Sequence, residues 1–449
     1  MDHWCLTACL LAAIALRGLV IWLHADELAA DRDAYLGIAR GVAELRGFCS
    51  PGSTAPTAFR PPLYPLMVGA LMAAVPTSVA VVLVNGLFGV AAVWATWRAS
   101  QCLVMGRAGL LAAFLVGVDP LLLRYIAQPM TETTCAGLVA LMLLAVVSDE
   151  WQRSRREWTV GALFGLLVLC RPTFWPLAGL MVAAWSLKSG FSESRTSLRG
   201  ASSRGEVRLT KLSRTSAFKC RPGLPWRVAV GTMLVVAPWV IRNQLVFGSP
   251  LLTTTHGGYT LQLANNPVFY DEVVDQPWGT VWSGDSLARW QLELDKRLER
   301  DLGPRASEIE RDHRQNTIAR EFIASEPRRF ARAVWHRVRS LWSTVPHGDV
   351  TGGPTRWLIE AVGWYYSFIL LAFAVGMIVV ARRPDRGRWW MLYALVITVQ
   401  AVHLAYWTNA RMRAPLTPVI ALFAAAILAP RARPASSKWP LVQGRSDLS

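Results

Sequence analysis

Two aspartates, Asp31 and Asp33, stand directly after the first long apolar stretch of this 449-residue chain. A carboxylate placed beside a reacting hydroxyl can act as a general base. The pair is also a D-x-D pattern, which can bind a metal ion. Residues two apart on a helix point to different sides, so a shared ion requires both aspartates in the coil before the helix. Capping that helix is the ordinary alternative for Asp31.

The aspartates are predicted to open a helix over residues 33–46 that lies on the membrane surface. Tyr35 and Ile38 fall on its apolar face, and Asp33 and Arg40 fall on the opposite face. This two-sided pattern is typical of an interfacial helix.

Five arginines form the second group of chemically capable residues. The planar guanidinium fork can bond two oxygens of one phosphate. These arginines are predicted at the outer ends of spans, where the positive-inside rule predicts few cations. A lipid phosphate in the outer leaflet would suit them, and snorkelling to head groups is the ordinary alternative. They are Arg60, Arg171, Arg242, Arg411 and Arg413, and Glu132 opens a predicted span at the same level.

A membrane-spanning scaffold must position these residues. The chain is 53% hydrophobic, has 21 Trp and carries a net charge of +17, with apolar runs separated by basic loops. This favours an all-α polytopic membrane protein of about ten spans over a nucleic-acid binder. The spans are predicted at 4–23, 78–99, 108–126, 132–148, 157–171, 174–188, 227–246, 357–381, 388–407 and 413–430, with 63–76 as a short interfacial or re-entrant segment.

Loop charges predict the orientation and the domains. Basic loops indicate a cytoplasmic N-terminus, and the first helix is predicted to be retained. Pro327 is expected to divide the helical pattern of the large outer segment into two helices. The predicted parts are a transmembrane module at 1–246, with an outer loop at 24–77 and a cytoplasmic basic loop at 188–226, an extracytoplasmic, mostly helical domain at 247–356, C-terminal transmembrane helices at 357–430 and a cytoplasmic tail at 431–449.

The seven cysteines form no CxxC pair and no zinc-like cluster, so they are predicted as small buried hydrophobes. Ionisable residues are nearly absent from the middle of the predicted spans. A transporter should carry such residues, so their placement favours chemistry at the outer interface. The alternatives are a transporter or flippase for a lipid-linked sugar and a non-catalytic scaffold.

Five local patterns, in order, resemble the GT-C superfamily of membrane glycosyltransferases. The likeness is to the bacterial branch related to protein O-mannosyltransferases and the lipid A aminoarabinose transferase. The patterns are "DRDAYLGIARGVAELRGF", "FRPPLYPLMVGAL", "PMTETTCAGLVAL", "PWVIRNQLVFGSPLLTTTHGGYTLQLANNP" and "RMRAPLTPVIALF".

The resemblance implies inverting sugar transfer from a polyprenyl-phosphate donor to a protein, glycolipid or glycan acceptor, on the extracytoplasmic face of the plasma (inner) membrane. It implies Asp31 as the base and Glu132 as the acid of the second outer loop. Family members often have Asp-Glu where this chain has Asp31-Arg32, so Asp33 stays an alternative. The implied lipid-phosphate ligands are Arg60, Arg242, Arg411 and Arg413, to which the outer position adds Arg171.

Contacts to the sugar or acceptor are expected from five further residues. No cofactor is required, since arginine can neutralise the leaving group, although a divalent metal ion held by His256 with an acid is compatible with the sequence. No nucleic-acid partner is expected. The contact residues are Tyr35, Tyr64, His256, Asn265 and Asn266.

Overall fold

The computed structural model describes residues 4–149, 151–183, 226–282, 284–345 and 356–430, together with the backbone of 2 and 3. Its described part is helical and contains no strand, only an isolated bridge between Cys49 and Pro56. The predicted basic loop at 188–226, apart from its last residue, and the tail at 431–449 lie outside the described residues. The division into domains stays a prediction.

Among the described residues, four helices are long and apolar enough to cross a membrane: α1 (Asp2–Leu23, apolar from Trp4), α4 (Thr77–Cys102), α10 (Trp226–Phe247) and α16 (Arg356–Ala381). A fifth span results if the bent pair α5 (Ala108–Gly117) and α6 (Pro120–Ile126) is counted as one. The predicted count of ten is therefore not confirmed. Other expected spans form helices that are shorter than the roughly 20 residues a span needs: α7 (Glu132–Val147), α8 (Arg153–Cys170), α17 (Trp390–Val402) and α18 (Thr417–Ala426). The expected span 174–188 begins in the helix Pro172–Ala183, and its last residues lie outside the described part.

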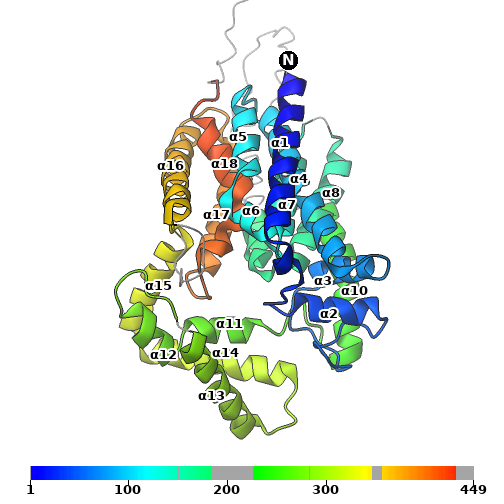
Figure 1. The fold of residues 1–449 in the computed structure, drawn as a ribbon, viewed down its shortest axis with the longest axis vertical. Helices are drawn as coiled ribbons and strands as arrows, with labels where there is room; N and C mark the ends of the chain where they lie inside the picture. The colour runs from blue at the N-terminus through cyan, green and yellow to red at the C-terminus, as the bar shows by residue number, and fades with distance from the viewer. Residues whose placement is uncertain (1, 150, 184–225, 283, 346–355, 431–449) are drawn as a thin grey trace, which may run out of the picture.

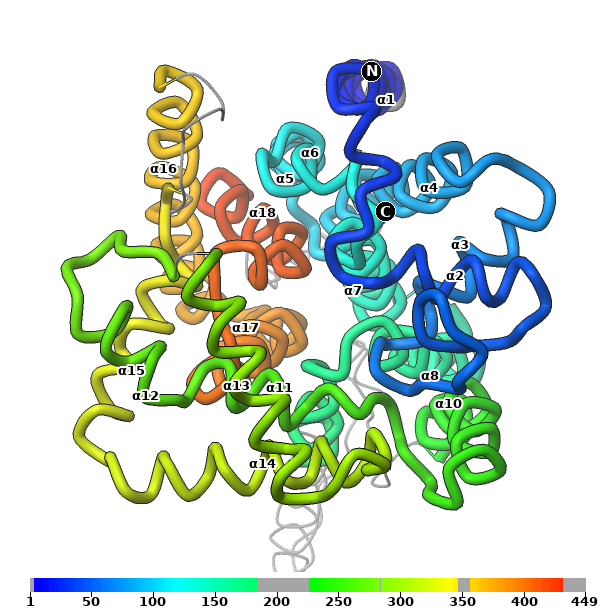
Figure 2. The backbone as a smooth tube through the Cα atoms, turned by 60° about the horizontal axis from the view of Figure 1, so that its bottom comes forward, coloured from blue at the N-terminus to red at the C-terminus, as the bar shows by residue number. Residues whose placement is uncertain are grey.

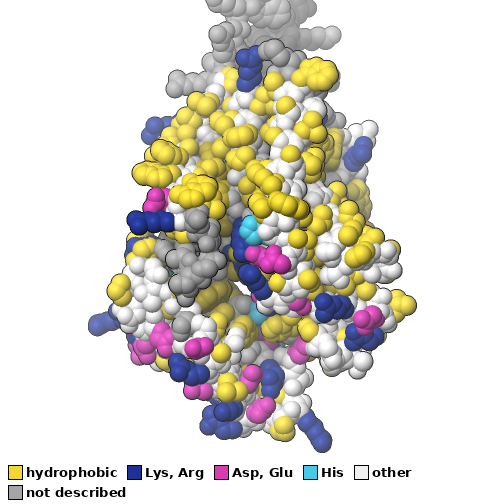
Figure 3. All heavy atoms as spheres, in the orientation of Figure 1, with side chains coloured by type: hydrophobic (Ala, Val, Ile, Leu, Met, Phe, Trp, Pro, Cys, Tyr) yellow, Lys and Arg dark blue, Asp and Glu magenta, His cyan; other side chains and the backbone are white. Residues whose placement is uncertain are grey.

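Helices at the periphery of the bundle expose apolar side chains in the way expected of lipid-facing surfaces. On α10, Leu234 and Ile241 are 65% and 58% exposed, and on α16 Phe368 and Leu371 are 66% and 64% exposed. In the space-filling view, hydrophobic side chains cover the upper part and charged side chains gather in the lower part (Figure 3). These helices support the prediction of a membrane protein.

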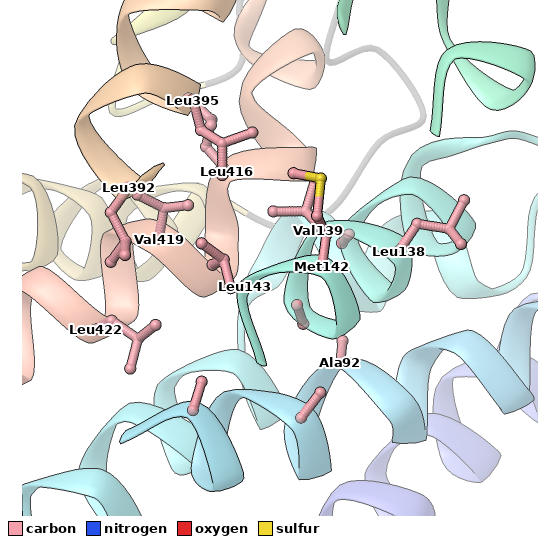
Figure 4. Packing of buried hydrophobic residues seen from close by; sticks show 14 of the residues in the cluster. Ala92, Leu138, Val139, Met142, Leu143, Leu392, Leu395, Leu416, Val419 and Leu422 are labelled. Carbon is pink, nitrogen blue, oxygen red and sulfur yellow. The ribbon is translucent and has the colours of Figure 1, made fainter. Parts of the chain in front are cut away.

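Helix α7 is the central element and is buried along almost its whole length. Its side chains Val139, Met142 and Leu143 lie among residues of α4, α17 and α18 (Figure 4). A helix that is apolar on all sides belongs in a core. Glycines allow its close approach to α4, since a Cβ on Gly137 would lie 2.7 Å from the carbonyl oxygen of Phe88.

A charged contact stabilises the break between α5 and α6. Arg17, within α1, donates to the carbonyls of Gly117 at 2.8 Å and Val116 at 3.2 Å. Asp119 caps α6 by accepting from the Leu122 N–H at 3.0 Å, and Tyr366 donates to the same carboxylate at 3.2 Å. Ionisable residues were expected to be nearly absent from the middle of the spans. Arg17 corrects this expectation, because it is buried inside a span, where it bonds the carbonyls at the end of α5.

The expected surface helix begins later than predicted, as α2 (Tyr35–Ala43), and is followed by the short α3 (Leu63–Met72). The segment predicted to be extracytoplasmic forms five helices, which we call the outer helices. They are α11 (Gly257–Ala264), α12 (Pro267–Phe269), α13 (Gly284–Leu302), α14 (Glu308–Ser325) and α15 (Pro327–Leu341). Helices are present on both sides of Pro327, as predicted. These outer helices lie at one end of the bundle, on the side of α2 and α3 (Figures 1 and 2).

Two carboxylates on α14 fix the start of α11, and one of them also attaches the outer helices to the first outer loop. Glu308 accepts from the Thr57 hydroxyl at 2.5 Å, the Ala58 N–H at 3.0 Å and the Thr255 hydroxyl at 3.0 Å. Asp312 accepts from the N–H of Gly258, in the first turn of α11, at 2.6 Å. We call these two residues the α14 clamp.

Gly376→Ala is expected to lower the free energy of unfolding by about 2 kcal/mol, because overpacking a tight helix contact forces the backbones apart. The new Cβ would lie 1.9 Å from the carbonyl oxygen of Phe423, where α16 packs on α18. Thermal unfolding in detergent measures the change. Gly86→Ala, with nothing within 4 Å of its Cβ, is the control, and equal stability of both variants would contradict this account of the packing.

Candidate functional site

A network of three arginines and two carboxylates lies where the helical bundle meets the outer helices. Arg411 joins the two acids: its NH1 donates to Asp33 Oδ2 at 3.2 Å, and its Nε lies 3.2 Å from Glu132 Oε1. Arg171 NH2 donates to Glu132 Oε1 at 2.5 Å, and Arg60 NH2 lies 3.5 Å from Asp33 Oδ1. We call these five residues the Arg–acid cluster.

Helix ends position the buried half of this cluster. Glu132 is the first residue of α7, where the helix dipole favours an anion. Arg171 follows the last residue of α8 in an extended conformation (φ −146°, ψ 113°), as expected for a residue before proline. Its Nε donates to the hydroxyl of Thr131 at 2.9 Å. The start of α7 and the end of α8 therefore bring this ion pair together.

Arg411 comes from a 3-10 segment (Ala410–Leu416) that begins beside α7. The Asn409 side chain caps this segment by accepting from the Arg411 N–H at 3.1 Å. Arg411 also lies over the Tyr125 ring, with its guanidinium carbon 5.9 Å from the ring centroid. Segments about 380 residues apart in the sequence thus meet at Asp33 and Arg411.

Asp31 and Asp33 both lie in the coil before α2, yet they serve different partners. Asp31 accepts from the N–H groups of Leu36 at 2.9 Å and Gly37 at 2.6 Å, which is the capping role weighed in the sequence analysis. Only Asp33 is joined to the arginines. Ala34 between them and the helix has a φ of 64°, and this left-handed residue separates Asp33 from the helix start.

Arg60 is the member of the cluster that contacts the outer segment. Its NH1 is 3.1 Å from Nε2 of His256, and its guanidinium carbon is 5.5 Å from the Tyr35 ring centroid and 5.1 Å from that of Phe59. A guanidinium only donates, so Nε2 of His256 must be the unprotonated acceptor. Burial, and then the Arg60 charge, hold the pKa of His256 well below its ordinary value.

Other predicted site residues serve the fold elsewhere. Arg242 donates to the carbonyls of Thr57 and Phe48, both at 2.9 Å, and so ties the first outer loop to α10. Arg413 is 1% exposed and donates to the carbonyls of Leu341 and Ser343. Neither arginine contacts the Arg–acid cluster, because each of the two donates to backbone carbonyls instead.

Three predicted sugar contacts are also satisfied internally. Tyr64 is fully buried and donates to Asn85 Oδ1 at 3.2 Å. Asn265 donates to the carbonyls of Leu261 and Ala405. Asn266 caps α12 by accepting from the Phe269 N–H at 2.9 Å. Tyr35 is buried beneath Arg60. Of the five residues predicted to contact sugar or acceptor, only His256 forms a hydrogen bond with an arginine of the cluster.

The acids of the cluster and His256 face arginines in this structure. In the part of the chain that the structure describes, no three His, Cys, Asp or Glu side chains gather as metal ligands would. The two acids of the cluster instead face guanidinium groups, and His256 faces Arg60.

No family model matches the chain, and no curated protein sequence is significantly similar to it. Among solved structures, the apo oligosaccharyltransferase of Archaeoglobus fulgidus is similar over 94% of this chain and 50% of its own, with 15% identity and a TM-score of 0.52. The chain has a GT-C fold. It spans about half the length of these oligosaccharyltransferase chains, and the likeness at this identity is one of fold.

Two further structures are similar with lower scores. One is AglB from A. fulgidus with an inhibitory peptide and a dolichol-phosphate, at 14% identity, 94% and 49% coverage and a TM-score of 0.47. The other is ArnT from Cupriavidus metallidurans bound to undecaprenyl phosphate, at 13% identity, 94% and 78% coverage and a TM-score of 0.39. The GT-C resemblance of the sequence motifs is confirmed for the fold.

The stability of this protein is expected to fall as the pH is lowered below about 6.5, the ordinary histidine pKa. His256 stays neutral in the folded state because its pKa is lowered, whereas the unfolded chain takes up the proton. Comparing Tm at pH 7.5 and 5.5 tests this. His256→Gln should show a smaller loss than the wild type, and His313→Gln, an exposed control, should match the wild type. Equal losses in all three proteins would contradict the His256 contribution.

Proposed function

We propose that this protein is a glycosyltransferase that moves a sugar from a polyprenyl-phosphate donor to an acceptor hydroxyl at the outer face of the plasma membrane. The observation that supports it is the Arg–acid cluster, in which separated segments of a GT-C fold bring three guanidinium groups and two carboxylates together. Its location, at the boundary between the apolar helices and the outer helices, suits a lipid-linked substrate.

The charges of the cluster match the proposed reaction. Three guanidinium groups and two carboxylates leave one positive charge, with His256 neutral. A polyprenyl-phosphate sugar is a phosphodiester with one negative charge. As the bond between the anomeric carbon and the phosphate oxygen breaks, a second negative charge develops on the leaving phosphate. Preplaced guanidinium groups stabilise that charge in the transition state.

The two acids differ in exposure, and we assign them different roles. The Glu132 side chain is 1% exposed, and both of its arginines contact one oxygen, so we assign it to orient Arg171 and Arg411. The Asp33 side chain is 25% exposed and can reach an acceptor. We therefore propose Asp33, rather than the Asp31 favoured by the motif spacing, as the general base that takes the acceptor proton.

A single displacement follows from this arrangement. The acceptor oxygen attacks the anomeric carbon opposite the phosphate, its proton passes to Asp33, and the phosphate leaves with the bonding electrons. One in-line displacement inverts the anomeric centre. Arg60, Arg171 and Arg411 hold the phosphate oxygens, while His256 and the Tyr35 ring hold Arg60 in place.

Asp33→Asn is expected to reduce sugar transfer by about 10²-fold or more, since it removes the proton acceptor. Transfer of label from radiolabelled polyprenyl-phosphate sugars in membranes measures it. Asp31→Asn is the matched control two residues away, and it should retain most activity because it serves the α2 cap. Loss of transfer in Asp31→Asn with retention in Asp33→Asn would reverse the assignment, and movement of the donor across the membrane without transfer would instead support the flippase.

Arg411→Gln is expected to reduce the transfer rate by about 10²- to 10³-fold, the effect of removing one preorganised donor to a developing anion. Arg32→Gln, an exposed arginine that pairs with Glu27 at 3.5 Å, should leave the rate near wild type. The rate at saturating donor separates the two variants. An unchanged rate in Arg411→Gln would remove Arg411 from the proposed phosphate site.

A further inference from the structure

A cavity with polar and apolar walls lies among the outer helices, and none of its lining residues belongs to the Arg–acid cluster. It has a volume of about 640 Å³ and is lined by α13 on one side, α14 on the other, and the end of α11 with α12. Trp290, Phe322 and Val268 contribute apolar surface. The charged groups of the walls are Glu293, Lys296, Arg297, Arg300 and Glu321. A cavity of this size holds one or two sugar rings.

Gln262 lines this cavity with an unused acceptor. Its side chain is 3% exposed, and its Oε1 has no hydrogen-bond partner among the described residues. A buried polar atom without a partner has a substantial free-energy cost, so it indicates a ligand that supplies the missing donor. Its neighbours Asn265 and Asn266 also line the cavity, but their amides are engaged with backbone groups.

The chemistry of the walls selects the ligand class. The Gln262 oxygen and the carboxylates of Glu293 and Glu321 accept hydrogen bonds from hydroxyl groups, and Arg297 donates to hydroxyl or ring oxygens. Trp290 and Phe322 offer surface to the C–H face of a ring. The walls carry three cations, Lys296, Arg297 and Arg300, and two acids, so a hydroxyl group finds both donors and acceptors there. Donors and acceptors beside aromatic surface suit a polyhydroxylated ligand.

Helix α11 connects the cavity to the cluster. His256, which contacts Arg60, stands at its start, and Gln262 lies six residues further along. Six helical residues rise about 9 Å, roughly the length of two linked sugar rings. A glycan acceptor with its reacting hydroxyl at Asp33 would therefore have its more distant sugars near Gln262.

We propose that the cavity around Gln262 is a saccharide-binding subsite and that the acceptor is a glycan or glycoconjugate. The assignment of an acceptor rests on the proposed transferase function, whereas saccharide binding by the cavity does not. The subsite holds the acceptor some distance from the reacting centre, so it contributes to acceptor affinity rather than to the chemical step.

Binding of the full-length, detergent-solubilised protein to an array of neutral and acidic oligosaccharides tests the subsite. Wild type is expected to bind a subset of neutral glycans, with affinity reduced about tenfold in Gln262→Leu, the effect of one lost hydrogen bond with its acceptor. Glu321→Gln, an exposed change on the cavity wall that spares the fold, should also weaken binding. Gln276→Leu, outside the cavity, should bind like wild type.

Two outcomes of the array experiment would contradict the subsite. No glycan binding by wild type, or equal binding by wild type, Gln262→Leu and Glu321→Gln, would overturn the subsite. The array requires no transfer, so loss of the transferase proposal would leave Gln262-dependent binding intact. With the transferase active, Gln262→Leu should raise the KM for an array-selected glycan and leave kcat within about twofold, and a fall in kcat at unchanged KM would contradict the subsite role.

Discussion

The burial of one carboxylate, Glu132, is the constraint on which the rest of the site depends. A charged group that is 1% exposed needs cationic partners, because its desolvation has a large free-energy cost. Arg171 and Arg411 meet this need on one oxygen, and the other oxygen has no partner in the described chain. The ends of α7 and α8 and the 3-10 segment after α17 must therefore converge. Arg411 then extends the network to Asp33, and Asp33 extends it to Arg60.

The helices around the site follow from the same requirement. Helix α7 carries Glu132 at its start and is buried along its length, so the position of the acid is set by the core and not by a mobile loop. Rigid elements hold catalytic geometry better than loops do. Arg60 and Asp33 come from the first outer loop instead. That loop is fixed by Arg242 through two carbonyls and by Glu308 through residues 57 and 58.

The sequence predicted the longest helices well, since apolar length is a strong signal: 78–99 and 357–381 correspond to Thr77–Cys102 and Arg356–Ala381. The predicted roles of the charged site residues, and the side of the membrane on which they lie, stay predictions. The sequence could not tell which arginines face carboxylates and which face carbonyls, so Arg60, Arg171 and Arg411 meet acids while Arg242 and Arg413 do not. Every residue has a backbone carbonyl, so the residue types do not show which arginine will bond to one. Gln262 was missed for the same reason, because only packing shows that its neighbours are satisfied and it is not. Arg17 had a readable signal, as a charge inside an apolar run.

The α14 clamp has a consequence for how such proteins can diverge. Of two acids on a single helix, Glu308 joins the outer helices to the first outer loop at Thr57 and Ala58. Glu308 also bonds Thr255, and Asp312 bonds Gly258 of α11, so both acids fix the start of α11 on α14. The outer helices can therefore change in sequence, or be exchanged between proteins of this fold, provided that this small set of complementary groups is inherited together. A chimaera that separated the acids from their partners would leave Arg60 and His256 without a fixed position, even with every cluster residue intact.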